Sequence, residues 1–127
     1  MKRVYTVVLI PNSSTGFTVG IPAFHNWTEG NDLYDAIRMA RDAIGILGVT
    51  MEDHGETIPE DQEPDDEYKK YKTALVDIDF DVYRRSLEQK SVRKNITIPA
   101  WLDAEAKKKS VNFSKVMQDA LMEIVDA

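Results

Sequence analysis

The chain has 127 residues, 43% of them hydrophobic, which is enough for one ordinary domain or two small ones. It contains no cysteine, so a disulfide framework and a thiolate metal site are excluded. No apolar run approaches the roughly 20 residues of a membrane helix, and the opening MKRVYTVVLIP predicts a first strand rather than a signal peptide. We therefore expect a cytoplasmic protein with no membrane partner.

The formal net charge of −6 is unevenly distributed along the chain. Nine basic residues face three acidic ones between Arg84 and Lys115, whereas Glu52 to Glu67 holds nine acidic residues and no basic one. This asymmetry suggests two partners, a polyanion for the basic segment and a cationic protein for the acidic remainder. The alternative for the acidic run is an ordinary solvated loop.

The first part of the chain predicts a small sheet. Val4 to Ile10 is β-branched and aromatic, Phe17 to Ile21 follows a turn of PNSSTG composition, and Trp27-Thr28 is a short third strand. We expect Trp27 in the core, although tryptophan is also favoured as an anchor for a partner.

A helix should follow these strands, with Asn31 or Asp32 as its N-cap and Gly48 at its end. Its apolar face consists of Leu33, Ala36, Ile37, Ala40, Ile44 and Leu47. Residues 50–71 are acidic and predict an irregular connection, and Thr73 to Phe80 predicts another strand. The fold class is therefore α+β, with the order β-β-β-α-β and one helix on a sheet over residues 1–80.

Residues 81–91 form a polar linker with at most one helical turn, and residues 92–127 form a second domain. From Val92 to Ile98 the side chains alternate, so this segment predicts a strand. A helix should continue from Pro99, with Trp101 against the bundle, and Asn112 should cap a last helix. The apolar stripe of that helix consists of Phe113, Val116, Met117, Ala120, Leu121, Ile124 and Val125.

A lone strand and two short helices cannot build a core, so we expect two chains to pair their strands into a ribbon above four helices. The order of strand, Pro99, Trp-Leu helix and NFSKVMQDAL helix resembles the ribbon-helix-helix repressors, although Ser110 stands where many of them carry a glycine. The alternative is that these elements belong to a larger core within one chain.

A ribbon of this kind enters the major groove of DNA, so its outward side chains predict a DNA-binding site. Arg93, Asn95 and Thr97 face outward and suit base edges, whereas Lys94 has the inward parity and is expected at the DNA backbone. The start of the last helix, Asn112-Phe113-Ser114, should offer backbone amides to a phosphate, with charge from Lys115.

The order of motifs across nearly the whole chain resembles the HicB-type antitoxins. The segments that carry the resemblance are WTEGNDLYDAIRMARDAIGIL, ETIPED and KTALVDIDFDVYRR, followed by the ribbon-helix-helix tail. The loop Pro22-Ala23-Phe24-His25-Asn26 departs from the Pro-Gly-Cys wording of that family.

The resemblance implies a partial RNase H-like N-terminal domain without nuclease activity. That domain binds a small basic HicA-type toxin, an mRNA-cleaving ribonuclease, and blocks its active site, while the C-terminal domain binds operator DNA and represses the operon. The toxin-binding residues are unknown, with the acidic run Glu52 to Glu67 as a candidate, and the assembly is a homodimer or homotetramer. The alternative is a stand-alone ribbon-helix-helix regulator whose N-terminal domain senses a ligand.

An enzyme is not expected from the titratable residues. A metal-dependent nuclease needs clustered carboxylates, and Asp77, Asp79 and Asp81 lack a companion acid on the first strand. His25 and His54 are isolated and have no metal-ligand spacing. We therefore expect no catalytic residue, no metal site and no cofactor.

Overall fold

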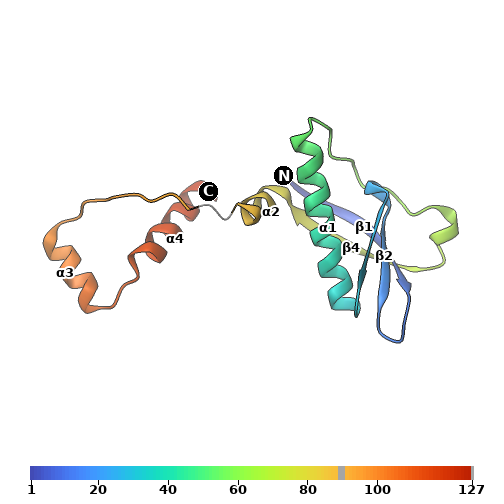
Figure 1. Cartoon of the computed structure of the whole chain (residues 1–127), viewed down its shortest axis with the longest axis horizontal. Coiled ribbons are helices and arrows are strands. Elements are labelled where there is room, and N and C mark those ends of the chain that lie inside the picture. The colour runs from blue at the N-terminus through green and yellow to red at the C-terminus, as the bar shows by residue number, and fades with distance from the viewer. Residues whose placement is uncertain (89–90, 127) are drawn as a thin grey trace. The chain divides into compact units, whose positions relative to one another are not determined.

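The computed structural model describes residues 1–88 and 91–126 and divides into two compact units, Met1–Lys90 and Ser91–Ala127 (Figure 1). Of the nine basic residues between Arg84 and Lys115, Lys90 lies outside the described residues. Among the helices described, none has the length and apolar character needed to cross a membrane.

The N-terminal unit has the predicted order β-β-β-α-β, followed by a further helix. Its elements are β1 (Lys2–Pro11), β2 (Phe17–Ile21), β3 (Asn26–Gly30), α1 (Leu33–Asp53), β4 (Lys72–Asp79) and α2 (Phe80–Leu87), with 3-10 turns η1 (Pro22–Phe24) and η2 (Asp66–Tyr68). The four strands form one antiparallel sheet in the order β3-β2-β1-β4. The α+β fold class is therefore confirmed for this unit.

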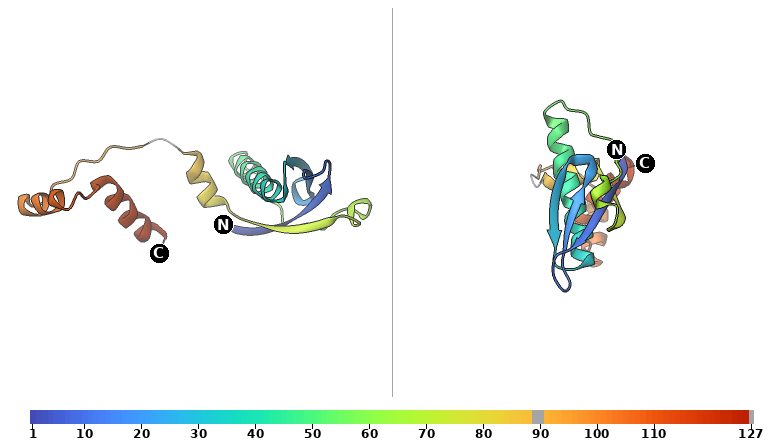
Figure 2. Two further views of the ribbon diagram at one scale, coloured as in Figure 1. Left: turned by 90° about the horizontal axis from the view of Figure 1, so that it is seen from below. Right: turned by 90° about the vertical axis from the view of Figure 1, so that its right-hand side faces the viewer.

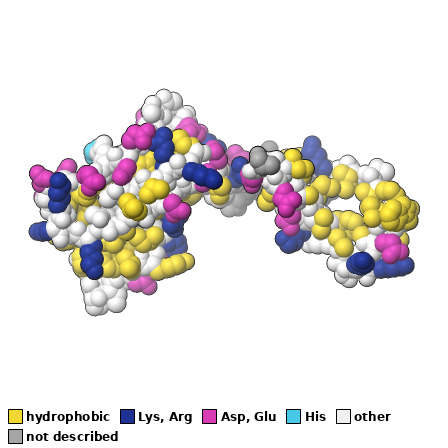
Figure 3. Space-filling model, turned by 180° about the vertical axis from the view of Figure 1, so that it is seen from behind, with side chains coloured by type: hydrophobic (Ala, Val, Ile, Leu, Met, Phe, Trp, Pro, Cys, Tyr) yellow, Lys and Arg dark blue, Asp and Glu magenta, His cyan; other side chains and the backbone are white. Residues whose placement is uncertain are grey.

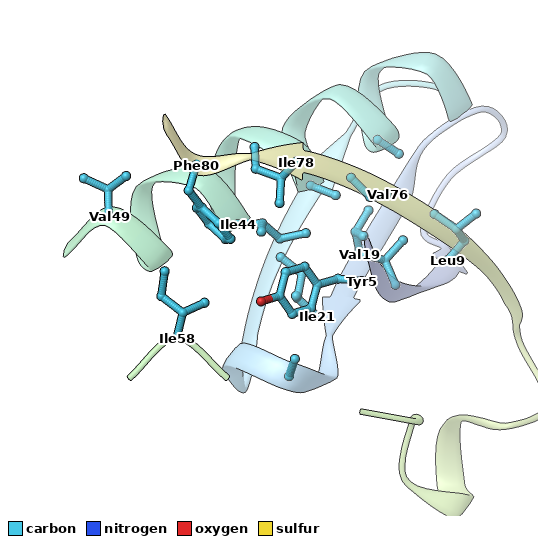
Figure 4. Packing of buried hydrophobic residues seen from close by; sticks show 14 residues of the cluster. Tyr5, Leu9, Val19, Ile21, Ile44, Val49, Ile58, Val76, Ile78 and Phe80 are labelled. Carbon is cyan, nitrogen blue, oxygen red and sulfur yellow. The ribbon is translucent and has the colours of Figure 1, made fainter. Parts of the chain in front are cut away.

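Helix α1 covers one face of the sheet, and the core lies between them (Figures 1 and 2). Alternate residues of the central strand β1 face the helix, because successive side chains of a strand point to opposite faces. The ring of Tyr5 is fully buried there and lies near that of Phe80 (Figure 4), edge-on with 6.4 Å between the ring centroids. It is also edge-on to Phe24, at 5.1 Å. These aromatic contacts join β1 to η1 and to the start of α2.

Strand β1 is longer than its neighbour β2, which pairs only with Val8 to Pro11. The chain that follows α1 lies beside the part of β1 that has no β2 partner. The backbone amide and hydroxyl of Thr6 donate to the two oxygens of Asp61 at 2.8 and 2.9 Å, and the Tyr5 hydroxyl donates to the carbonyl of Pro59 at 2.6 Å. Ile58 is buried in the core. Residues 54–71 are therefore irregular apart from η2, as expected for most of the connection, but Ile58 to Asp61 attach it to the sheet.

Helix α1 begins as the sequence predicts but ends later. Its N-cap is Asp32, whose carboxylate accepts from the amide of Asp35 at 2.8 Å. The predicted end at Gly48 is wrong, because the helix continues to Asp53. Gly48 lies on the buried face, where a Cβ would stand 2.2 Å from the ring of Phe80. This glycine makes room for α2 rather than terminating α1.

The segment expected to be a linker begins with α2, which packs on α1. Asp79 caps α2 by accepting from the amides of Asp81 and Val82. Arg84 forms ion pairs with Glu52 at 2.7 Å and Asp53 at 2.8 Å. Residues 80–87 therefore belong to the N-terminal unit.

The C-terminal unit contains helices α3 (Ala100–Lys108) and α4 (Phe113–Asp126). Residues 91–99 have no regular secondary structure, so the strand predicted over Val92 to Ile98 is not formed in the single chain. A lone strand lacks the hydrogen-bond partners that a second strand would supply. The predicted pairing with a second copy remains a prediction.

Replacing Gly48 with Ala should destabilise the protein by about 1–3 kcal/mol, because the added methyl group overpacks the contact with Phe80. A loss of stability would be evidence for the packing contact, because helix propensity alone favours alanine over glycine by about 1 kcal/mol. The matched control is Thr50→Ala on the exposed side of α1, which should change stability by no more than about 0.5 kcal/mol. Chemical denaturation of both variants tests this, and a Gly48→Ala protein as stable as the wild type contradicts the packing argument.

Candidate functional site

The predicted DNA-reading residues lie in the exposed segment before α3. Arg93, Lys94, Asn95 and Thr97 are all exposed, and among the described residues neither Arg93 nor Lys94 has an ion-pair partner. Their side chains are accessible to a polyanion. The strand geometry that would turn three of them to one face is not present in the single chain.

The predicted phosphate site at the start of α4 has a defined cap. The side-chain oxygen of Asn112 accepts from the amide of Lys115 at 3.0 Å, and the backbone carbonyl of Asn112 accepts from the amide of Val116 at 3.1 Å. Asn112 is thus the predicted N-cap. The amides of Phe113 and Ser114 precede those bonds and belong to the group that a helix leaves without intrahelical partners.

Three lysines of this unit are engaged within their own helices. Lys115 pairs with Asp119 at 3.1 Å, Lys107 with Asp103 at 3.0 Å and Lys108 with Glu105 at 3.4 Å. Such exposed pairs contribute about 0–1 kcal/mol each. They can therefore be exchanged for phosphate contacts at small cost.

The turn between the helices uses Ser110 in the left-handed conformation, with φ of 54°. The amide of Ser110 donates to the carbonyl of Lys107 and that of Val111 to Ala106, both at 3.1 Å. This pattern closes the end of α3 in the way that a glycine usually does. Ser110 therefore adopts the backbone conformation that glycine usually supplies, and the turn is formed without a glycine.

No residue among the described positions 91–126 is buried. Large apolar side chains lie open on both helices and on the preceding segment, as the C-terminal unit in Figure 3 shows. They include Val92, Ile96, Trp101, Leu102, Phe113, Val116, Met117, Leu121, Met122, Ile124 and Val125. A unit of this kind has no core of its own. The predicted packing of Trp101 on a helix bundle requires side chains from outside this unit.

The carboxylates considered for a metal site have other partners. Asp77 pairs with Arg41 at 3.0 Å, and this hydrogen bond holds the pKa of Asp77 below its usual value. Asp79 caps α2. Among the described residues there is no group of three or more His, Asp or Glu side chains that could hold a metal ion. His25 stands at the end of η1, and His54 stands at the end of α1, where its Nδ1 lies 2.7 Å from the carbonyl oxygen of Thr50.

The structure corrects the prediction that Trp27 belongs to the core. Trp27 lies on the face of β3 away from α1 and is 47% exposed. The ring lies over Gly20 of the neighbouring strand and against Tyr68 of η2, with 5.3 Å between the ring centroids. Residue spacing carries no signal for this contact, because Tyr68 belongs to the irregular connection.

The comparisons with known proteins agree with the motif order. Residues 5–120 match the family described as the HicB-like antitoxin of bacterial toxin-antitoxin systems, and the chain belongs to that family. No curated protein matches the chain.

Two solved structures show the fold at full length. A toxin-antitoxin complex from Streptococcus pneumoniae aligns with a TM-score of 0.56 and 20% identity, covering 97% of this chain and 99% of that one. The antitoxin HicB of Burkholderia pseudomallei aligns with a TM-score of 0.53 and 21% identity, covering 98% of this chain and 97% of that one. At these identities the likeness establishes the fold alone.

Proposed function

We propose that the protein neutralises a HicA-type toxin, an mRNA-cleaving ribonuclease, by covering its active site, and that it represses its own operon by binding operator DNA. The observation that carries the proposal is membership of the HicB-like antitoxin family over residues 5–120. The chain also aligns over nearly its full length with a chain of a toxin-antitoxin complex.

The N-terminal unit is the proposed toxin-binding part, and we propose that it is a partial RNase H-like domain. It holds seventeen acidic residues against ten basic ones, whereas Ser91–Ala127 holds five against six. An acidic surface accelerates the encounter with a cationic protein. Because the unit has its own core, its surface is formed before a partner docks.

The full chain should capture the toxin encoded by the neighbouring gene when the two are co-expressed, and should protect mRNA from cleavage in vitro. Association should slow as salt rises, because exposed charges are screened. Affinity pull-down with a tag on the antitoxin and an mRNA cleavage assay measure this. A chain that binds its operator but captures no toxin would instead be a stand-alone regulator with a ligand-sensing domain.

The C-terminal unit is proposed to form a ribbon-helix-helix pair with a second copy. The support is that none of the described residues 91–126 is buried, although α4 carries an apolar stripe and α3 exposes Trp101 and Leu102. A second copy covers the stripes and supplies the partner strand for residues 92–98. The protein is then at least a dimer, and a tetramer if the N-terminal units also pair.

Leu121→Asp should convert the protein to a monomer, because the charge would enter the apolar stripe between two copies. The matched control is Leu33→Asp, since Leu33 is 52% exposed and Leu121 is 51% exposed, but Leu33 lies in the N-terminal unit. Light scattering at micromolar concentration measures the mass of both variants. A wild-type protein that is already monomeric there refutes the paired arrangement.

We assign DNA reading to Arg93, Asn95 and Thr97, with Lys94 and the α4 start at the phosphates. In a paired strand the first three share the outward face, where arginine suits guanine and asparagine suits adenine. The α4 start contributes the amides of Phe113 and Ser114, and Asn112 caps the same turn through the amide of Lys115.

Asn95→Ala should reduce discrimination by about 1–3 kcal/mol at one base pair in each half-site. Lys115→Ala should instead weaken binding to all sequences alike and flatten the salt dependence, because it removes a charge without base contacts. Binding to operator and scrambled DNA across a salt series separates the two effects. An unchanged operator-to-scrambled ratio for Asn95→Ala refutes the assigned reading face.

A further inference from the structure

A hollow on the outer face of the N-terminal sheet combines aromatic rings with carboxylates. Val8, Gly20 and Trp27 lie side by side across β1, β2 and β3, and they form the floor and one wall. Asp65, Glu67 and Tyr68, from the chain that crosses this face, form the other wall. Figure 3 views the molecule from this side, opposite α1, and shows apolar and acidic side chains together on the N-terminal unit.

The aromatic wall is fixed by its neighbours. Gly20 lets the ring of Trp27 lie across β2, since a Cβ on Gly20 would stand 2.9 Å from that ring. Tyr68 meets Trp27 at an interplanar angle of 66°. The two rings hold each other in place and still leave nearly half of the Trp27 side chain open to solvent. An open tryptophan that packs against a neighbouring ring is a surface on which a partner side chain can stack.

The carboxylates of the hollow form no ion pair with the described residues of the chain. Asp65 precedes η2, but its side chain makes no capping hydrogen bond. Within the described part of the chain, neither Asp65 nor Glu67 has an ion pair or a side-chain hydrogen bond. Asp66, between them, pairs instead with Lys69 at 3.0 Å. Two unpaired negative charges therefore flank the aromatic rings.

Aromatic rings next to unpaired carboxylates favour the binding of a planar cation. A cation over the face of tryptophan or tyrosine is attracted by the ring quadrupole, and a carboxylate adds charge-assisted hydrogen bonds. Arginine offers both through its planar guanidinium group, whereas the compact ammonium of lysine stacks less well. The hollow has a volume of about 210 Å³, which is below the range of about 300–1,000 Å³ for small-molecule pockets and fits one side chain better.

We propose that this hollow binds an arginine side chain of the protein partner, with the guanidinium group stacked on Trp27 and paired with Asp65 and Glu67. The proposal rests on the proposed function for its occupant, since the toxin of that proposal is a small basic protein. It assigns to Trp27 and Tyr68 the role of an anchor at the interface, where tryptophan, tyrosine and arginine are enriched.

The first test measures the affinity of the full-length protein for the toxin of the neighbouring gene by calorimetry. Trp27→Leu, and the double variant Asp65→Asn with Glu67→Gln, should each weaken binding at least about ten-fold. The matched controls are Tyr34→Leu, an exposed tyrosine on α1, and Asp66→Asn, the adjacent carboxylate that pairs with Lys69. Wild-type affinity in both hollow variants overturns the proposal and leaves the antitoxin function standing.

The second test needs no toxin. Argininamide is titrated into the full-length protein while the indole N–H signals of Trp27 and Trp101 are followed by NMR. A saturable shift of Trp27 alone is expected, larger than with lysinamide and absent in the double carboxylate variant. No Trp27 shift overturns the cation site, even if Trp27→Leu weakens toxin binding, since the contact would then be apolar. If the wild-type protein captures no toxin, the proposed function fails, and this titration still decides the hollow.

Discussion

The hydrogen bonds between Thr6 and Asp61 complete the central strand of the N-terminal unit. Strand β1 has ten residues and β2 has five, so part of β1 lacks a neighbour on that side. A backbone amide left unsatisfied at a buried position such as Thr6 would cost about 1–3 kcal/mol. Asp61 removes this cost with one carboxylate, and Arg3 adds an ion pair to Glu60 at 2.9 Å. The acidic connection is thereby held along β1.

Other features of the unit follow from this attachment. Ile58 enters the core on one side of Asp61, and Pro64 is buried on the other side of it. The chain then crosses the outer face of the sheet and brings Tyr68 against Trp27. The sheet is thus covered by α1 on one face and, over part of the other face, by the irregular connection.

Local rules account for the elements that the sequence predicts correctly. The β-branched strand β1, the Asp32 cap of α1 and the Asn112 cap of α4 are all present, because each depends on neighbours within a few residues. Packing decides the exception at Gly48. A glycine near the end of an apolar helical stripe predicts a helix end, but this one lacks a Cβ so that the ring of Phe80 can approach α1.

Long-range contacts account for the other differences. The size and apolar character of Trp27 predict a core residue, but β3 is an edge strand and Tyr68 packs against the ring on its outer face. Nothing in the spacing of the acidic run predicts that Asp61 bonds to Thr6, since the two are 55 residues apart. Alternation alone proposes Arg93, Asn95 and Thr97 as one face, whereas the paired strand that would unite them is not formed in the single chain.

The absence of any buried residue among the described positions 91–126 has a consequence for the lifetime of the protein. Under the dimer proposal, the C-terminal unit folds only by association, so its folded fraction follows mass action. At low abundance this half would be an open substrate for proteases, while the N-terminal sheet persists. If the protein represses its operon and binds a toxin as proposed, repression would then fade before the N-terminal unit is lost. Falling protein concentration would itself restart synthesis.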